Sequence, residues 1–180
     1  MKRYALSAIG RDRPGIVAAV TKALYEHDCN IEDSSMTILE DEFAVILIMT
    51  MPEEGDEEAL LMAMKEVEGE FGLIVNLKEL LPPVPGEEAE NANYMITLHG
   101  ADKSGIVYKT AALLAEMGVN ITDLETKALG AEGERIYIMM MEVFSPEGTD
   151  IKGIEGKLNE LGKEIGVTIK IKPVESFEPL

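Results

Sequence analysis

The 180-residue chain repeats itself at an offset of 90 positions, and this duplication constrains the fold more than any other feature. The offset pairs Tyr4 with Tyr94 and continues without a gap to Asp33 and Asp123, with matched glycines, leucines and asparagines between these ends. A fixed internal period is the sequence signature of a structural unit that occurs more than once. The sequence therefore predicts two domains of the same fold, residues 1–80 and residues 93–180.

A proline-rich and acidic segment, residues 81–92, separates the two copies. Its prolines cannot continue a helix or a central strand, and its acidic second half has little apolar surface to bury. Such a composition is typical of a solvated, semi-stiff linker. We therefore expect residues 81–92 to connect the two domains without joining the core of either.

Both copies have the same order of predicted elements, judged from apolar alternation for strands and helical spacing for helices. In the first copy these are strands over 2–9, 31–39, 43–51 and 73–80, and helices over 16–27 and 56–71. In the second copy they are strands over 94–99, 121–129, 134–144 and 167–173, and helices over 104–118 and 150–165. The order βαββαβ predicts an α+β fold of two ferredoxin-like sandwiches in tandem, each an antiparallel sheet with both helices on one face.

The third predicted strand of the first copy, Phe43 to Met51, is apolar on both of its faces. Alternate side chains of a strand point to opposite faces, so only one set can pack against the helices. The other set would leave a contiguous apolar patch in water, which is unusual on a monomer. We expect the second repeat or another chain to cover this face, and we expect a homodimer.

The charge of the chain excludes direct binding to nucleic acid. Asp and Glu number 34 against 16 Lys and Arg, which gives a net charge of −18 and an isoelectric point near 4.4. Protein–DNA affinity comes largely from lysines and arginines that neutralise phosphates, and this chain has no basic stripe. We expect no direct contact with nucleic acid.

The apolar segments and the cysteine content indicate a cytoplasmic protein. The longest apolar run, Phe43 to Met51, is far shorter than the ~18 residues of a membrane span, and the N-terminal residues do not form a secretory signal. The single cysteine, Cys29, excludes an internal disulfide and a cysteine-based zinc cluster. The two histidines do not occupy equivalent repeat positions. We therefore expect no membrane contact, no metal, no cofactor and no catalysis.

A glycine-containing loop after the first strand of each copy is the candidate functional segment. It reads GRDRPGIV at Gly10 to Val17 and GADKSGIV at Gly100 to Val107. Glycine lets a backbone approach a ligand closely, and the free N–H groups of a helix N-terminus attract a carboxylate or a phosphate. A phosphate-binding P-loop needs Lys-Ser or Lys-Thr directly after its last glycine, and both copies have Ile-Val instead. A carboxylate held by the backbone, with Asp12 or Asp102 holding an ammonium group, describes a free amino acid.

The same residues also fit a purely structural interpretation, which the loop alone favours. Pro14 suits the first position of a helix, and an aspartate near a helix N-terminus complements the helix dipole. Asn30 and Asn120 follow the first helix of each copy, where asparagine is a common turn residue, although we also expect the second strand to pass the glycine loop there. At this point ligand binding and helix initiation both remain open.

The segment GRDRPGIV, followed by a helix and then by CNIEDSSMTILEDEFAVILIM, resembles the ACT domain in its tandem form. The resemblance extends over essentially the whole chain. The first copy is most similar to the glycine cleavage system transcriptional repressor family, which has a similar DRPGIV and CNIEDS. The second copy departs from that pattern, because Ser104 replaces the proline and ITDLETKA replaces the stretch after the first asparagine.

The resemblance implies a regulatory protein that binds an amino acid and catalyses nothing. It implies binding at domain or subunit interfaces, through the loop after the first strand and the start of the second strand, which here are Asp12, Pro14, Gly15, Ile16, Asn30 and Ile31, and Asp102, Gly105, Ile106, Asn120 and Ile121. Glycine or serine is the first ligand to expect. The resemblance also implies action through a DNA-binding activator protein and not through DNA. The alternatives are an assembly module without a ligand, or an allosteric regulatory subunit of an amino-acid-metabolic enzyme.

Overall fold

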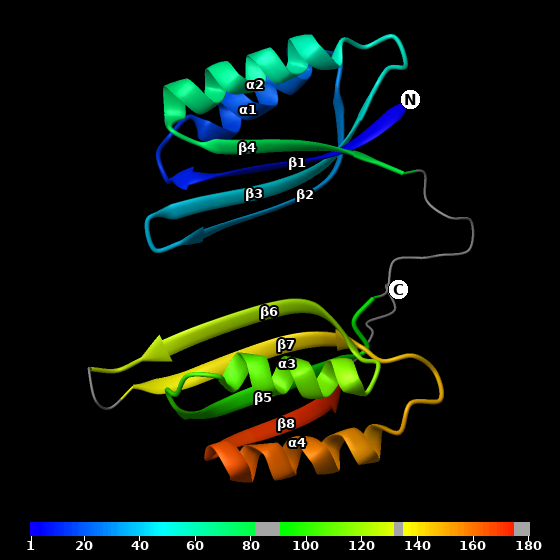
Figure 1. Ribbon diagram of the computed structural model, residues 1–180. Helices are drawn as coiled ribbons and strands as arrows, with labels where there is room; N and C mark the ends of the chain where they lie inside the picture. Colours follow the sequence, from blue (N-terminus) through cyan, green and yellow to red (C-terminus); the bar gives the residue numbers. More distant parts are fainter. Residues whose placement is uncertain (82–90, 132–134, 175–180) are drawn as a thin grey trace, which may run out of the picture. The chain divides into compact units, whose positions relative to one another are not determined.

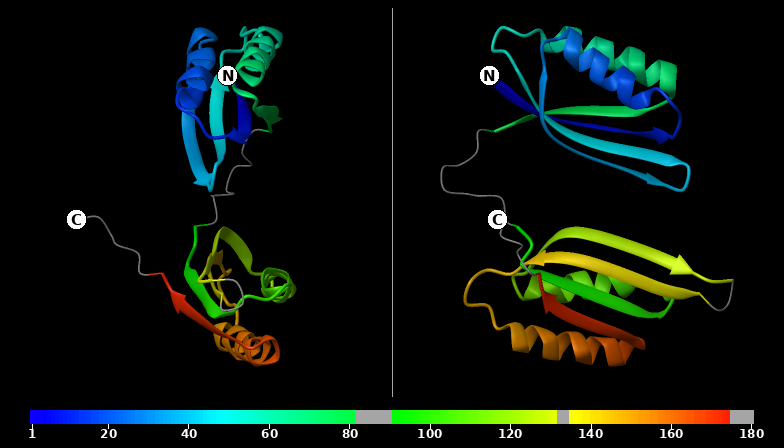
Figure 2. Two further views of the ribbon diagram at one scale, coloured as in Figure 1. Left: turned by 90° about the vertical axis from the view of Figure 1, so that its left-hand side faces the viewer. Right: turned by 180° about the vertical axis from the view of Figure 1, so that it is seen from behind.

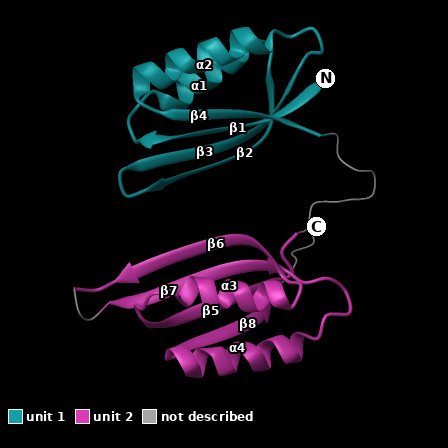
Figure 3. Ribbon diagram, in the orientation of Figure 1, with its two compact units in different colours: residues 1–87 teal, residues 88–180 magenta. Residues whose placement is uncertain are grey.

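The computed structural model describes residues 1–81, 91–131 and 135–174. The chain divides into two compact units, Met1–Glu87 and Glu88–Leu180, which Figure 3 shows in separate colours. Most of the expected linker, residues 81–92, lies outside the described residues. Each unit is therefore considered by itself.

Each unit has the predicted βαββαβ order, which confirms the α+β ferredoxin-like fold (Figure 1). The first unit contains β1 (Lys2–Arg11), α1 (Ile16–Glu26), β2 (Asn30–Leu39), β3 (Glu42–Met51), α2 (Glu57–Phe71) and β4 (Ile74–Leu80). The second contains β5 (Tyr94–Ala101), α3 (Ile106–Glu116), β6 (Asn120–Leu129), β7 (Ile136–Phe144), α4 (Ile151–Ile165) and β8 (Val167–Pro173). The antiparallel sheets have the strand orders β2-β3-β1-β4 and β6-β7-β5-β8.

Both helices of each unit lie on one face of its sheet, as Figure 2 shows. Most apolar side chains of the two central strands that face the helices are almost completely buried, and the inward stripes of the helices complete the core. In the first unit these include Tyr4, Leu6, Leu47, Met49, Ile16, Leu24 and Leu60; in the second they include Ile96, Leu98, Met139, Met141, Ile106, Leu114 and Ile154. Two separate cores result. Within the described residues, none of the helices is long and apolar enough to cross a membrane.

The opposite face of the first sheet has no helix and keeps apolar side chains exposed. Ile46 of β3 pairs with Ser7 of β1 on this face and is 50% exposed. Ile9 and Ile74 lie on the same face and are 50% and 66% exposed. The two-sided apolar character of the third strand is thus confirmed, while its cover by another unit or another chain stays a prediction.

The edge strand β2 is exposed along its whole length, on both faces. Met36 pairs with Val45, whose position faces the helices, and yet Met36 is 52% exposed. The helices thus leave the helix side of β2 uncovered. An apolar border remains beside the beginning of α1.

The close packing of α4 on β8 yields a stability prediction with a control in the same helix. A Cβ at Gly162 would lie 2.8 Å from the carbonyl oxygen of Val167, whereas a Cβ at Gly156 would meet nothing within 4 Å. Gly162→Ala is therefore expected to lower the free energy of unfolding by about 1–3 kcal/mol through overpacking. Gly156→Ala is expected to raise it by about 0.5–1 kcal/mol, because alanine loses less backbone entropy in a helix.

Urea unfolding followed by circular dichroism measures both changes. Two alanine variants with equal stability would contradict the packing of α4 against β8.

Candidate functional site

A left-handed glycine marks the turn from β1 into α1. Gly15 is the N-cap residue of α1 with φ of 101°, and Gly105 has the same place before α3 with φ of 88°. Both values lie in the region that favours glycine over residues with a Cβ. The prediction that Pro14 occupies the first helical position is wrong, because α1 begins at Ile16 and Pro14 lies in the preceding turn. Ser104 likewise precedes α3 and lies outside it.

The first turns of α1 and α3 begin without a side-chain cap. The carbonyl oxygen of Gly15 accepts from the N–H of Ala19 at 2.8 Å, as a regular helix requires. The N–H groups at the first three helical positions have no acceptor within the helix and point toward the loop. Asp12 and Asp102 are therefore not caps, and each helix presents backbone donors at this end.

These donors border an open pocket of about 570 Å³ in the first unit. Its lining consists of the loop and first turn, together with one residue each from β2 and β3: Asp12, Arg13, Pro14, Gly15, Ile16, Val17, Ala18, Met36 and Phe43. Four predicted site residues of the first copy, Asp12, Pro14, Gly15 and Ile16, thus lie together. The wall that faces them is apolar.

The loop motifs do not predict the apolar wall, although strand pairing contains the signal for it. β1 and β3 are antiparallel neighbours, so the beginning of β3 lies beside the end of β1, and Phe43 pairs with Gly10. Among the apolar lining residues, Phe43 is 1% exposed, whereas Met36 and Val17 are about half exposed.

The structure does not bring the asparagines to this pocket. Asn30 pairs with Thr50, which also pairs with Arg3 near the beginning of β1. The distance along β1 from Arg3 to Gly10 is about 23 Å of strand. Asn30 and its neighbour Ile31 therefore lie at the opposite end of the sheet, and the expectation that β2 begins beside the glycine loop is wrong.

The second unit has the same arrangement. Asn120 pairs with Phe144, and the neighbouring Ile121 pairs with Val143, which is itself paired with Tyr94 at the beginning of β5. Asp102, Gly105 and Ile106 lie at the other end of the sheet, between β5 and α3. In each unit the loop residues form one group and the asparagine with its isoleucine forms another.

Backbone hydrogen bonds attach both loops to the neighbouring hairpin. The N–H of Asp12 donates to the carbonyl oxygen of Asp41 at 2.7 Å, and the N–H of Asp102 donates to that of Arg135 at 3.2 Å. These bonds fix the backbone of each aspartate, while both residues are exposed. The carboxylates thus lie on anchored loops at the end of the central strand.

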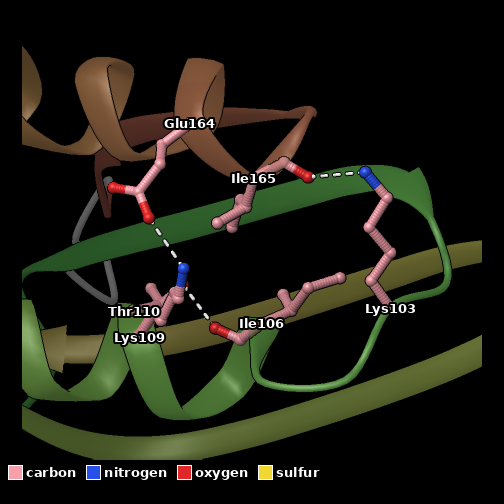
Figure 4. Close-up of polar contacts among 6 residues, drawn as sticks. All are labelled: Lys103, Ile106, Lys109, Thr110, Glu164 and Ile165. Atoms are coloured by element: carbon pink, nitrogen blue, oxygen red, sulfur yellow. Dashed lines mark hydrogen bonds and ion pairs between the residues drawn. The ribbon is translucent and has the colours of Figure 1, made fainter.

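A basic side chain attaches each loop to the C-terminal end of the second helix. The guanidinium of Arg13 donates to the carbonyl oxygen of Glu70 and lies 4.9 Å from the ring centroid of Phe71. At the matching place, the Nζ of Lys103 donates to the carbonyl oxygen of Ile165 at 3.1 Å (Figure 4). Cations are favourable at a helix C-terminus, because its last carbonyl groups lack partners in the helix.

The second unit adds an ion pair beside this contact. The Nζ of Lys109 on α3 lies 2.7 Å from a carboxylate oxygen of Glu164 on α4 (Figure 4). Thr110 follows on α3, is buried, and donates its hydroxyl to the carbonyl oxygen of Ile106 at 2.9 Å. The loop and the two helices of this unit are thus joined at one end.

Comparison with known proteins matches both halves of the chain. The family model for the ACT domain matches residues 4–78 and, separately, residues 94–172. The glycine cleavage system transcriptional repressor of Escherichia coli strain K12 is 28% identical over 183 residues, which cover 94% of this chain and 88% of the relative. A UPF0237 protein of Methanocaldococcus jannaschii is 40% identical over 70 residues, which cover 39% of this chain and 78% of the relative.

A solved structure has a similar fold over nearly its full extent. The crystal structure of an unknown protein from Galdieria sulphuraria has a TM-score of 0.79 and 27% sequence identity. The similarity covers 97% of this chain and 99% of that one. The tandem arrangement of two βαββαβ units therefore recurs in another protein.

The contact of Arg13 with α2 yields a prediction about loop anchoring. Arg13→Ala removes a hydrogen bond to a helix C-terminus and a cation–π contact, and we expect the free energy of unfolding to fall by about 0.5–1 kcal/mol. Arg11→Ala is the matched control, because Arg11 is an exposed arginine at the end of β1. Chemical denaturation compares the variants, and equal stability of the two would contradict the anchoring role of Arg13.

Proposed function

Because both halves match the ACT-domain model, the chain belongs to the ACT-domain family, and we propose that it is a regulatory protein that binds a free amino acid. The pocket beside Asp12 is the observation that carries this proposal. The similarity to a transcriptional repressor along 94% of the chain supports a regulatory role over an enzymatic one. The amino acid is the signal, and a protein contact transmits it.

The proposed binding geometry uses the two charged groups that every free amino acid has. The carboxylate accepts hydrogen bonds from the backbone N–H groups at the beginning of α1, where the helix dipole also favours negative charge. The ammonium group pairs with the carboxylate of Asp12. Glycine is the first ligand to test, because it has these two groups and no side chain; serine is the second.

The second unit repeats both recognition groups, so the proposal includes a site there. Asp102 matches Asp12, and Gly105 precedes the uncapped first turn of α3 as Gly15 precedes that of α1. Ile106, like Ile16, is buried beneath the first turn. Asn30, Ile31, Asn120 and Ile121 are not part of the proposed site within a single unit.

We propose that the regulatory output is contact with a DNA-binding activator protein. The net charge of −18 opposes direct binding to the phosphate backbone, so a second protein must contact the DNA. The exposed apolar face around Ile46 offers a surface for such a partner or for a homodimer. If the chain binds no amino acid, the remaining functions are an assembly module or a regulatory subunit of an amino-acid-metabolic enzyme.

Thermal unfolding tests the amino-acid site. Glycine at 100 times its dissociation constant should stabilise the folded protein by roughly 2.7 kcal/mol, which corresponds to a rise in melting temperature of roughly 5–10 °C. Asp12→Ala should abolish the glycine-dependent rise in the melting temperature of the first unit. Asp102→Ala should abolish the corresponding rise for the second unit. The double variant should show none.

Glu66→Ala is the matched control, because it removes an exposed carboxylate from α2 outside the pocket. This variant should respond to glycine as the unmodified protein does. A glycine response that survives in the double aspartate variant would contradict the proposed recognition of the ammonium group.

An electrophoretic mobility shift assay tests whether the chain acts through a protein partner and does not bind DNA itself. The purified chain at physiological salt should not retard double-stranded DNA, because it has no concentrated positive charge to release counterions from the phosphates. A retarded band that disappears as salt is raised would show direct electrostatic binding and would contradict the proposed mechanism.

A further inference from the structure

The pocket residues fall into two groups when the two units are compared position by position. Four of the nine lining residues are identical in the second unit: Asp12 and Asp102, Gly15 and Gly105, Ile16 and Ile106, and Val17 and Val107. Arg13 is replaced by another cation, Lys103, which makes the same type of contact with a helix end. These residues supply the carboxylate, the turn and the base of the uncapped helix.

The remaining four lining residues change, and each change introduces a hydroxyl group. They are Pro14 and Ser104, Ala18 and Tyr108, Met36 and Thr126, and Phe43 and Tyr137. For the two pairs that lie in strands, the strand pairings show that the positions are structurally equivalent. Phe43 pairs with Gly10 as Tyr137 pairs with Gly100.

The pairing on the edge strands is equivalent too. Met36 of β2 pairs with Val45 of β3, and Thr126 of β6 pairs with Met139 of β7. Met36 is 52% exposed and Thr126 is exposed, so both side chains are accessible to a ligand at this place. The pocket lining of the first unit is thus apolar at these positions, and the equivalent positions of the second unit carry hydroxyl-bearing residues.

The two walls favour different ligand side chains. A hydroxyl placed against Met36, Val17 and Phe43 would lose its hydrogen bonds with water and find no replacement in their side chains. An aliphatic side chain there would cover apolar surface that is now in contact with water. Beside Thr126 and Tyr137 we expect the order to reverse, because a ligand hydroxyl can exchange hydrogen bonds with the hydroxyl groups of these residues. An aliphatic ligand would displace water from them without replacing its hydrogen bonds.

We propose that the two units bind different amino acids, an aliphatic one in the first unit and a hydroxyl-bearing one in the second. The inference rests on the proposed amino-acid binding and adds the side-chain class of each ligand. Asp12 and Asp102 hold the ammonium groups that both ligands share. This assignment places serine in the second unit.

Isothermal titration calorimetry of the full chain tests the assignment with leucine and serine as probes. Each probe should bind once, and saturation with leucine should leave the affinity for serine unchanged. Asp12→Ala should remove only the leucine site, and Asp102→Ala should remove only the serine site.

Exchange of the wall residues between the two units tests whether these residues determine which amino acid each unit prefers. Met36→Thr should weaken leucine binding by about tenfold or more without changing serine binding, and Thr126→Met should do the reverse. Both residues lie on exposed edge strands, so each substitution leaves the buried cores intact. Phe43→Tyr also adds a hydroxyl group to the first wall and should likewise weaken leucine binding. Because Phe43 is buried, circular dichroism is the control for folding.

The outcomes separate this inference from the proposed function. If glycine, leucine and serine all fail to bind, both the proposed function and this inference are overturned. If amino acids bind but compete for both sites, or if Met36→Thr and Thr126→Met leave the preferences unchanged, only the division of ligands between the units is overturned. The selective losses described above would establish it.

Discussion

Two helices cover only part of a four-stranded sheet, and the position of the pocket depends on this. The strand order puts β1 and β3 in the centre of the first sheet, where their helix-facing side chains are buried. β2 lies at the edge and is exposed on both faces, so Met36 keeps half of its surface in water. The first turn of α1 begins beside this uncovered border. The pocket therefore forms where the loop after a central strand meets an edge strand that the helices do not cover.

The loop that lines this pocket is anchored on both sides. On one side the backbone of Asp12 is hydrogen-bonded to the β2–β3 hairpin through the carbonyl of Asp41, and on the other Arg13 contacts the end of α2. Gly15 then turns the chain into α1 through a backbone conformation that side chains disfavour. A loop held in this way presents its helix N–H groups in a fixed direction before any ligand arrives. Such preorganisation reduces the ordering cost of binding.

The sequence predicts the fold well because the repeat and the apolar periodicity point to the same elements. The order of strands and helices, the linkage of strands into two sheets and the helix-bearing face all follow from these patterns. The predicted start at residue 16 agrees with α1, but the place of Pro14 is ambiguous in the sequence, because a Pro-Gly pair fits either the first helical turn or the turn before it. Only the left-handed φ of Gly15 separates these possibilities.

The candidate site was only partly predictable for a topological reason. α1 runs from the loop back along the sheet, and its eleven residues extend about 16 Å, so the chain reaches Asn30 near the other end. Nearness in sequence predicts this asparagine beside the loop, although the helix leads the chain away from it. The wall residues Met36 and Phe43 are distant from the loop in sequence and reach it through antiparallel pairing. Strand register predicts their place beside the loop, whereas loop motifs alone do not.

Duplication explains how one fold can keep a recognition chemistry while its selectivity changes. The ammonium and carboxylate of an amino acid are the same in every ligand, so the aspartate, the left-handed glycine and the free helix N–H groups are useful unchanged in both units. The wall contacts only the part of the ligand that varies, and its residues come from separate strands and turns. Met36 and Thr126 can therefore differ without disturbing either the loop or the buried core. For this reason we expect sequence differences between the repeats to concentrate at the positions that contact the variable part of the ligand. Four of the nine lining positions indeed carry a hydroxyl-bearing residue in the second unit and none in the first.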